Sequence, residues 1–84
     1  MYQKQVVVKS VTGLHARPGT MVAELALKFN SNITIEFNDA KINAKEILEI
    51  LTSNINCGDN ITITAEGPDE QEAVVALEEL ISKE

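Results

Sequence analysis

Several residue types are scarce in this chain of 84 residues, and each scarcity excludes a class of structure. The single cysteine, Cys57, excludes an intramolecular disulfide framework and a metal site built from several cysteines. Its polar, glycine-containing surroundings predict a turn, so we interpret Cys57 as an ordinary loop residue. No apolar run approaches the roughly 18–20 residues of a membrane-spanning helix, and no signal peptide follows Met1. We therefore expect a cytoplasmic protein.

Basic residues are scarce as well: seven lysines and arginines stand against thirteen aspartates and glutamates, a net charge of −6. Nucleic acids and anionic membrane surfaces select basic proteins, so this balance argues against both as partners. We expect a single domain over residues 1–84, because a chain of this length buries only about 60–68% of its unfolded surface. One modest core follows, without an internal cavity of enzyme size.

Alternating apolar and polar residues predict the strands of this domain. The β-branched centre at Val6, Val7 and Val8 predicts the first strand, and Ile61, Ile63 and Ala65 mark the clearest one. The predicted strands cover residues 3–10, 33–37, 40–43 and 61–66. Turns are expected at residues 38–39 and 57–59, because small polar residues and glycine gather there.

Apolar residues that repeat every three or four positions predict three helices, over residues 16–30, over residues 44–53 and after Asp69. Asn43 and Glu46 are expected to form a capping box at the second helix, and Asp69 and Glu72 a similar pair at the third. The predicted order is βαββαβα. Because strands with one apolar face need cover on one side only, we predict an α+β fold: an open-faced sandwich of a mainly antiparallel four-stranded sheet and three helices.

One segment stands apart, because it holds the only histidine and the only arginine at a predicted strand-to-helix junction. Its sequence is Gly13-Leu14-His15-Ala16-Arg17-Pro18. A histidine at a helix N-terminus faces the positive end of the helix dipole, which favours the neutral, nucleophilic ring. A phosphoryl group on His15 would lie within reach of the Ala16 and Arg17 backbone N–H groups and of the Arg17 guanidinium. These features suit transient storage of a phosphoryl group.

Two interpretations of His15 stay open on these residues alone: a phosphoryl acceptor, and a polar group that merely caps a helix or faces solvent. A metal site is not expected, because the chain has no second histidine and the nearby carboxylates lack the spacing of metal ligands. The sequence shows no arrangement typical of a serine or cysteine nucleophile with its base. We expect no metal and no other cofactor.

The segment around His15 resembles the active-site motif of the HPr family, the histidine-containing phosphocarrier proteins of the bacterial phosphoenolpyruvate-dependent sugar phosphotransferase system. The resemblance continues through Asn43-Ala44-Lys45, through Gly58-Asp59 and through residues 67–73. It implies a phosphocarrier rather than a free-standing enzyme. His15 would accept a phosphoryl group on Nδ1 from enzyme I and pass it to the IIA domains of sugar permeases, with Arg17 contacting that group. A second possibility is an HPr-like regulatory module whose phosphorylation state signals to other proteins.

The resemblance also implies a surface that docks enzyme I and IIA domains. Its residues would be Thr20, Met21, Glu24, Ile47, Leu48 and Leu51. Ile47 and Leu51 are equally compatible with core positions, whereas Leu48 widens the apolar stripe beyond what so short a helix buries. We expect a monomer that neither binds nucleic acid nor inserts into a membrane.

Glu46 occupies the position of a regulatory serine in many members of the family, and a glutamate there cannot be phosphorylated. It either imitates phosphoserine or only completes the capping box with Asn43. Together with Glu24 and Glu49, Glu46 makes this neighbourhood more acidic than is usual for the family. Because charge complementarity affects association rate and specificity, this sign suggests basic or apolar counterpart surfaces on the partners.

Overall fold

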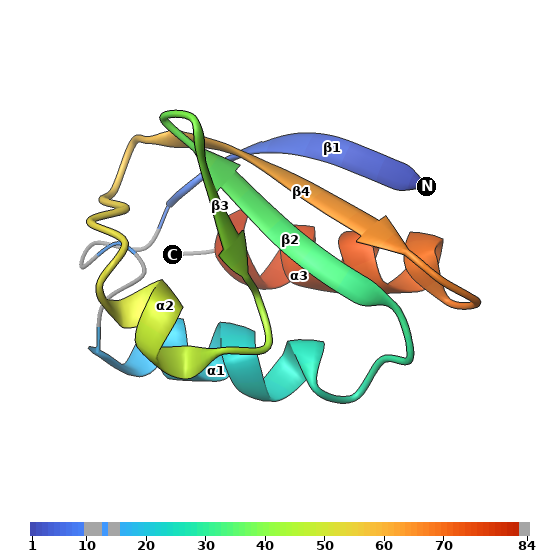
Figure 1. The fold of residues 1–84 in the computed structure, drawn as a ribbon. Coiled ribbons are helices and arrows are strands. Elements are labelled where there is room, and N and C mark those ends of the chain that lie inside the picture. The colour runs from blue at the N-terminus through green and yellow to red at the C-terminus, as the bar shows by residue number, and fades with distance from the viewer. Residues whose placement is uncertain (10–12, 14–15, 83–84) are drawn as a thin grey trace.

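The computed structural model describes residues 1–9, 13 and 16–82, with Ala16 and Arg17 described by their backbone only. Within this part the elements follow the predicted order. The strands are β1 (Tyr2–Val7), β2 (Asn32–Phe37), β3 (Ala40–Asn43) and β4 (Asn60–Glu66), and the helices are α1 (Ala16–Ala26), α2 (Ile47–Leu51) and α3 (Glu70–Ser82). Figure 1 shows the strands in one layer and the helices in a second layer under one of its faces. The predicted open-faced sandwich is confirmed.

The described strands form one sheet in the order β1-β4-β2-β3, and each neighbouring pair is antiparallel. Ile35 of β2 lies opposite Ile63 of β4 and Ile42 of β3, and Val6 of β1 lies opposite Ile61 of β4. All five side chains are buried. Because side chains alternate along a strand, this register turns the apolar face of every strand toward the helices.

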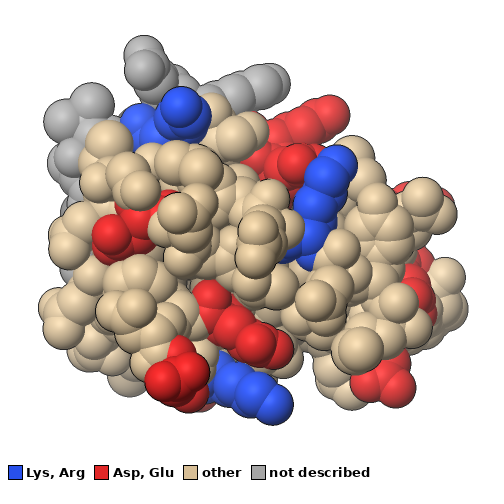
Figure 2. All heavy atoms as spheres, turned by 90° about the horizontal axis from the view of Figure 1, so that it is seen from above, with Lys and Arg blue, Asp and Glu red and all other residues tan. Residues whose placement is uncertain are grey.

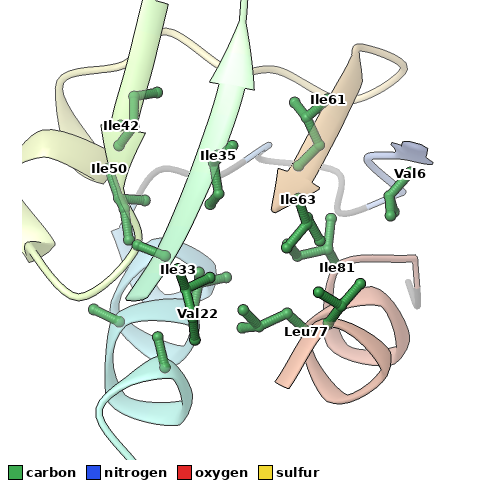
Figure 3. Close-up of a cluster of buried hydrophobic side chains, with 14 of the residues drawn as sticks. Val6, Val22, Ile33, Ile35, Ile42, Ile50, Ile61, Ile63, Leu77 and Ile81 are labelled. Carbon is green, nitrogen blue, oxygen red and sulfur yellow. The ribbon is translucent and has the colours of Figure 1, made fainter. Parts of the chain in front are cut away.

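The buried side chains of the sheet and the helices form one core (Figure 3). The helices contribute Val22 from α1, Ile50 from α2, and Leu77 and Ile81 from α3. The stripe predicted for the last helix is therefore confirmed at Leu77 and Ile81. Burying an apolar side chain of this size stabilises the fold by about 1.5–3 kcal/mol, so the core determines how the two layers lie on each other.

The opposite face of the sheet is not covered by any described helix. Its side chains are mostly polar, as in the row formed by Gln3, Thr64, Thr34 and Asn43 on adjacent strands. Figure 2 looks onto the molecule from this side and shows separated acidic and basic residues on a largely uncharged surface. This face accounts for the polar half of the alternation in the sequence.

The two-residue turn predicted between β2 and β3 is confirmed. Asn38 and Asp39 have φ angles of 48° and 67°, both in the left-handed region. Phe37 and Ala40 form the last pair of the hairpin. Turns with two left-handed residues match the twist of the strands they join, and asparagine and aspartate tolerate this conformation better than most residues.

Several element boundaries differ from the prediction, and α2, predicted over residues 44–53, covers only Ile47–Leu51. β1 ends at Val7, where it lies opposite the first residue of β4, Asn60. α1 ends at Ala26 instead of continuing to residue 30, because the Lys28 and Phe29 N–H groups donate to carbonyls only three residues back. Such tight bonds close the last turn of a helix. Phe29 still packs against the core. For this reason the helical spacing of apolar residues in the sequence continues past the end of the helix.

The predicted capping box at α2 is wrong. α2 begins at Ile47, and Glu46 is its N-cap residue, with extended φ and ψ of −103° and 103° and no side-chain capping hydrogen bond. The Asn43 side chain instead accepts a hydrogen bond from the Lys45 N–H at 3.0 Å. The carboxylate that reaches back to the Asn43 N–H, at 3.0 Å, belongs to Glu49. The role expected of Glu46 is therefore performed by a residue one turn later.

Candidate functional site

The segment that contains His15 connects β1 to α1, and Leu14 and His15 lie outside the described residues. Gly13 is buried and has a φ of 69°. A Cβ atom on Gly13 would lie 2.3 Å from the Ile55 carbonyl oxygen and 2.7 Å from the Asn56 Cα. Only glycine allows so close an approach of two backbones in this conformation. Gly13 is therefore packed against the loop that follows α2.

That loop is itself fixed by hydrogen bonds. The Asn56 N–H donates to the Asp59 carboxylate at 2.8 Å, and the Asp59 N–H donates to the Asn56 carbonyl at 3.1 Å. Val8, just after β1, donates to the Asp59 carbonyl at 2.9 Å and accepts from the Gly58 N–H at 2.8 Å. The predicted turn around Gly58 is confirmed, and it supports the backbone against which Gly13 packs.

α1 begins at Ala16, immediately after His15 in the sequence. No acidic residue lies in its first turn, whereas α2 has Glu49 there and α3 has Glu70 and Glu72. The first N–H groups of a helix have no intrahelical acceptor and carry partial positive charge. Of the helices described, α1 is thus the one without a carboxylate in its first turn. The free N–H groups at its N-terminus can therefore bind an anion without competition from an acidic side chain of that turn.

The far end of α1 is held by side chains from two other loops. The Lys45 Nζ donates to the Phe29 carbonyl at 2.8 Å. The Asp69 carboxylate accepts the Asn30 N–H at 2.9 Å and also accepts the Ser31 hydroxyl. The bond from the Ser31 hydroxyl is the main cause of a lowered pKa at Asp69, and the bond from the Asn30 N–H lowers this pKa further. Asp69 therefore holds the α1–β2 connection, and the capping pair predicted for Asp69 and Glu72 is replaced by this contact.

The start of α3 uses Glu70 in the place expected of Glu72. The Gly67 N–H donates to the Glu70 carboxylate at 3.3 Å, and the Met1 amino group lies 2.9 Å from the same carboxylate. The bond to the amino group is the main cause of a lowered pKa at Glu70. Glu70 and Glu72 place negative charge in the first turn of α3, and Glu70 instead of Glu72 occupies the capping position.

The six residues predicted to dock partners all lie on α1 and α2, which pack against each other. On α2, Leu48 is 72% exposed and Ile47 37% exposed, while Leu51 is partly buried. On α1, Met21 is 40% exposed, Glu24 is exposed and Thr20 is partly buried. The expected exposure of Leu48 is confirmed, and Ile50 supplies the buried anchor of the helix.

Leu27 lies on the same exposed side as Glu24 of α1, and it was not predicted from the sequence as a docking residue. It directly follows α1 and is 62% exposed. Thr20, Glu24 and Leu27 are spaced by four and three positions, which places them on one helical face. The available signal was that Leu27 does not fit the spacing of the buried residues Val22 and Ala26.

Neither a metal centre nor a membrane span is found in the described residues. No group of three or more histidine, cysteine, aspartate or glutamate residues among them is placed to hold a metal ion. None of the helices described is long and apolar enough to cross a bilayer. Cys57 is exposed in its turn, and its Sγ lies 3.8 Å from the Lys9 carbonyl oxygen.

Comparison with known proteins agrees with this arrangement. The model of the family described as PTS HPr component phosphorylation site matches residues 2–83. The HPr structure from Thermoanaerobacter tengcongensis has a TM-score of 0.93 at 41% identity, over 96% of this chain and 91% of that one. The phosphocarrier protein HPr from Bacillus anthracis has a TM-score of 0.93 at 40% identity, over 95% of both chains.

A third similar structure comes from a protein with a different description. The catabolite repression protein Crh of Bacillus subtilis has a TM-score of 0.76 at 36% identity, over 96% of this chain and 93% of that one. It is described as an intertwined dimer with a swapped domain. The similarity therefore extends both to phosphocarriers and to a relative named for catabolite repression.

Proposed function

Because this chain belongs to the HPr family of the phosphotransferase system, we propose that it is a single-domain phosphocarrier that holds a phosphoryl group on His15. The family consists of phosphocarrier proteins rather than conventional enzymes. The observation that carries the proposal is the match over residues 2–83, with His15 directly preceding, in the sequence, a helix whose first turn has no carboxylate.

The proposed reaction is an in-line transfer between two nitrogen atoms. The lone pair of His15 Nδ1 attacks the phosphorus of the phosphorylated donor, enzyme I. The N–P bond to His15 forms as the bond to the donor nitrogen breaks, and its electron pair remains on the donor ring. The Ala16 and Arg17 N–H groups and the Arg17 guanidinium would bind the phosphoryl oxygens. Positioning and electrostatic stabilisation dominate such transfers. No cofactor takes part on this chain.

The second half of the proposed cycle passes the phosphoryl group to a IIA domain of a sugar permease. Both partners would dock on the surface formed by Thr20, Met21, Glu24, Ile47, Leu48 and Leu51. The exposure of the neighbouring side chains Leu48 and Ile47 on α2 supports this, because adjoining exposed apolar side chains often mark a contact surface. We propose a cytoplasmic location and a monomer. Since the relative Crh is described as a dimer, size-exclusion chromatography with light scattering tests this, and the mass of one chain is expected.

Because position 46 is a glutamate, we propose that this chain is not regulated by serine phosphorylation at that position. It is exposed at the N-cap of α2 and makes no side-chain capping bond. The capping explanation offered for Glu46 has therefore lost its support, which favours the alternative that its carboxylate is a permanent negative charge at this helix. Incubation with an HPr kinase and ATP should leave position 46 unmodified. A mass shift located at Glu46 would contradict this.

A second candidate function is a regulatory module whose phosphorylation state is read by other proteins. The similarity to Crh at 36% identity favours it. In that case His15 would still be phosphorylated, but the group would not reach a IIA domain.

The test of the proposed function is phosphorylation by enzyme I with phosphoenolpyruvate and Mg²⁺. We expect one acid-labile phosphoryl group, located on His15 by fragmentation mass spectrometry. His15→Ala should abolish labelling, and Arg17→Ala should slow it, while both variants keep the far-UV circular dichroism of the original chain. No adduct with any competent enzyme I would exclude both candidate functions. An adduct that never passes to a panel of IIA domains would favour the regulatory module.

A further inference from the structure

Exposed apolar side chains concentrate on two contacting helices. Of the seven large hydrophobic residues exposed in the described part of the chain, four lie on α2, on α1 or directly after α1. They are Met21, Leu27, Ile47 and Leu48. We call these four residues the α1–α2 patch. Exposed apolar area of this kind typically marks a contact surface for another protein.

Carboxylates lie next to the residues of the α1–α2 patch along the chain. Glu24 lies between Met21 and Leu27 on α1, and Glu46 directly precedes Ile47 and Leu48. Both glutamates are exposed, and neither forms an ion pair with a residue that the structure describes. Their charge is therefore not neutralised within the described part of the molecule and is available to a partner.

The lysines nearest in sequence form no ion pair with these glutamates in the part of the chain that the structure describes. Lys45 directs its ammonium group to the Phe29 carbonyl, 2.8 Å away, at the far end of α1. Lys28 lines the same surface hollow as Met21 and Glu24, but no ion pair joins Lys28 to Glu24 among the described residues. Glu49 adds a third exposed carboxylate on α2, held by the Asn43 N–H. A phosphoryl group on His15 would add about −1.5 to −2 charges at the start of α1.

We propose that the protein surface that docks on the α1–α2 patch has an apolar centre bordered by lysine or arginine side chains. This inference rests on the proposed function and specifies the chemistry of its partner. Apolar contact supplies affinity, and opposite charge at the rim raises the association rate and rejects acidic competitors. An acidic partner surface would instead meet Glu24 and Glu46 with like charge.

The test measures the KM of enzyme I from the same organism for this chain, in phosphoenolpyruvate-dependent labelling of His15, at low and high NaCl. Glu24→Lys and Glu46→Lys should each raise KM by about two- to five-fold, the range for one exposed charge pair. Glu24→Gln and Glu46→Gln should raise it less. Because salt screens exposed charges, added NaCl should raise the KM of the original chain more than that of the doubly reversed variant.

Glu79→Lys is the matched control. Glu79 is exposed on α3, and its substitution changes the net charge of the chain by the same amount. It should leave KM unchanged at each salt concentration. Thermal melting should show that all variants are folded, since exposed substitutions usually change stability by less than about 0.5 kcal/mol.

The outcomes separate the inference from the proposed function. Complete labelling of His15 with a KM that falls, or does not change, in the lysine variants would overturn the inference alone. Binding of enzyme I weakened by salt and by both reversals, but without any labelling, would support the inference and overturn the proposed function. Neither binding nor labelling would overturn both.

Discussion

The close approach of Gly13 to the loop after α2 makes Gly13→Ala the sharpest perturbation of this fold near its site. The new Cβ would lie 2.3 Å from the Ile55 carbonyl oxygen and 2.7 Å from the Asn56 Cα. Both neighbours are backbone atoms, so neither can move aside by a change of rotamer. The loop that carries them is also tied to β1 through Val8 and Gly58.

The expected destabilisation combines strain and overlap. Alanine in the left-handed conformation costs roughly 1–2 kcal/mol, offset by roughly 0.4–1 kcal/mol because alanine restricts the unfolded chain. Overpacking adds about 1–3 kcal/mol. Gly13→Ala should therefore lower the free energy of unfolding by about 1–4.5 kcal/mol. In a domain of this size that corresponds to a fall in Tm of roughly 5–35 °C.

Gly58→Ala is the matched control for the strain alone. Gly58 has a φ of 92°, and no atom lies within 4 Å of the position its Cβ would take. Its substitution should lower the free energy of unfolding by only about 0–1.5 kcal/mol. Both variants are compared by urea denaturation and by thermal melting followed with circular dichroism.

Equal losses of stability in the two variants would refute the argument, because the backbone contact would then contribute nothing. A second measurement examines the site itself. At a temperature where both variants are folded, Gly13→Ala should slow the labelling of His15 by enzyme I more than Gly58→Ala does. The same labelling rate in both would mean that the contact supports the fold without positioning the histidine segment.

Other consequences of the structure can be tested in the same way. Because the Ser31 hydroxyl and the Asn30 N–H lower the pKa of Asp69, this carboxylate contributes stability above its unfolded pKa of 3.8, and that contribution is lost as the pH falls below it. Urea denaturation should therefore show Asp69→Asn less stable than the original chain at pH 7, with the difference shrinking at acid pH; a difference independent of pH would contradict the assignment. Leu77 is fully buried, so Leu77→Ala should cost about 2–5 kcal/mol in the same assay. Val75→Ala, at an exposed position of the same helix, should cost less than about 0.5 kcal/mol, and equal costs would refute the placement of the core.

The sheet could be predicted from the sequence because its information is local. Alternation at Ile61, Ile63 and Ala65 identifies both a strand and its buried face, and these side chains are all in the core. The turn at Asn38 and Asp39 follows from residues that tolerate left-handed backbone. The order of elements and the single covered face follow from the same patterns.

The end of α1, the bounds of α2 and the capping contacts could not be predicted, because they depend on contacts that the local pattern does not show. The Asp69 carboxylate has the local position of a helix cap, but it binds Ser31 and Asn30, which lie 38 and 39 residues away. Glu49 replaces Glu46 in reaching Asn43. For the candidate site, the motif identified the residues, whereas the support of Gly13 by the loop at Ile55 depends on the tertiary fold.

The strand order has a consequence for how the protein is made. β1 is paired only with β4 in the described sheet, and β4 also separates β1 from β2. The hairpin of β2 and β3 is local and can form early, but β1 finds its neighbour only when residues 60–66 leave the ribosome. Pairings so distant in sequence are slow, because a long loop must close first. The strand that precedes His15 is thus paired late in folding. A chain whose synthesis is unfinished therefore lacks the folded domain that the partner proteins would bind.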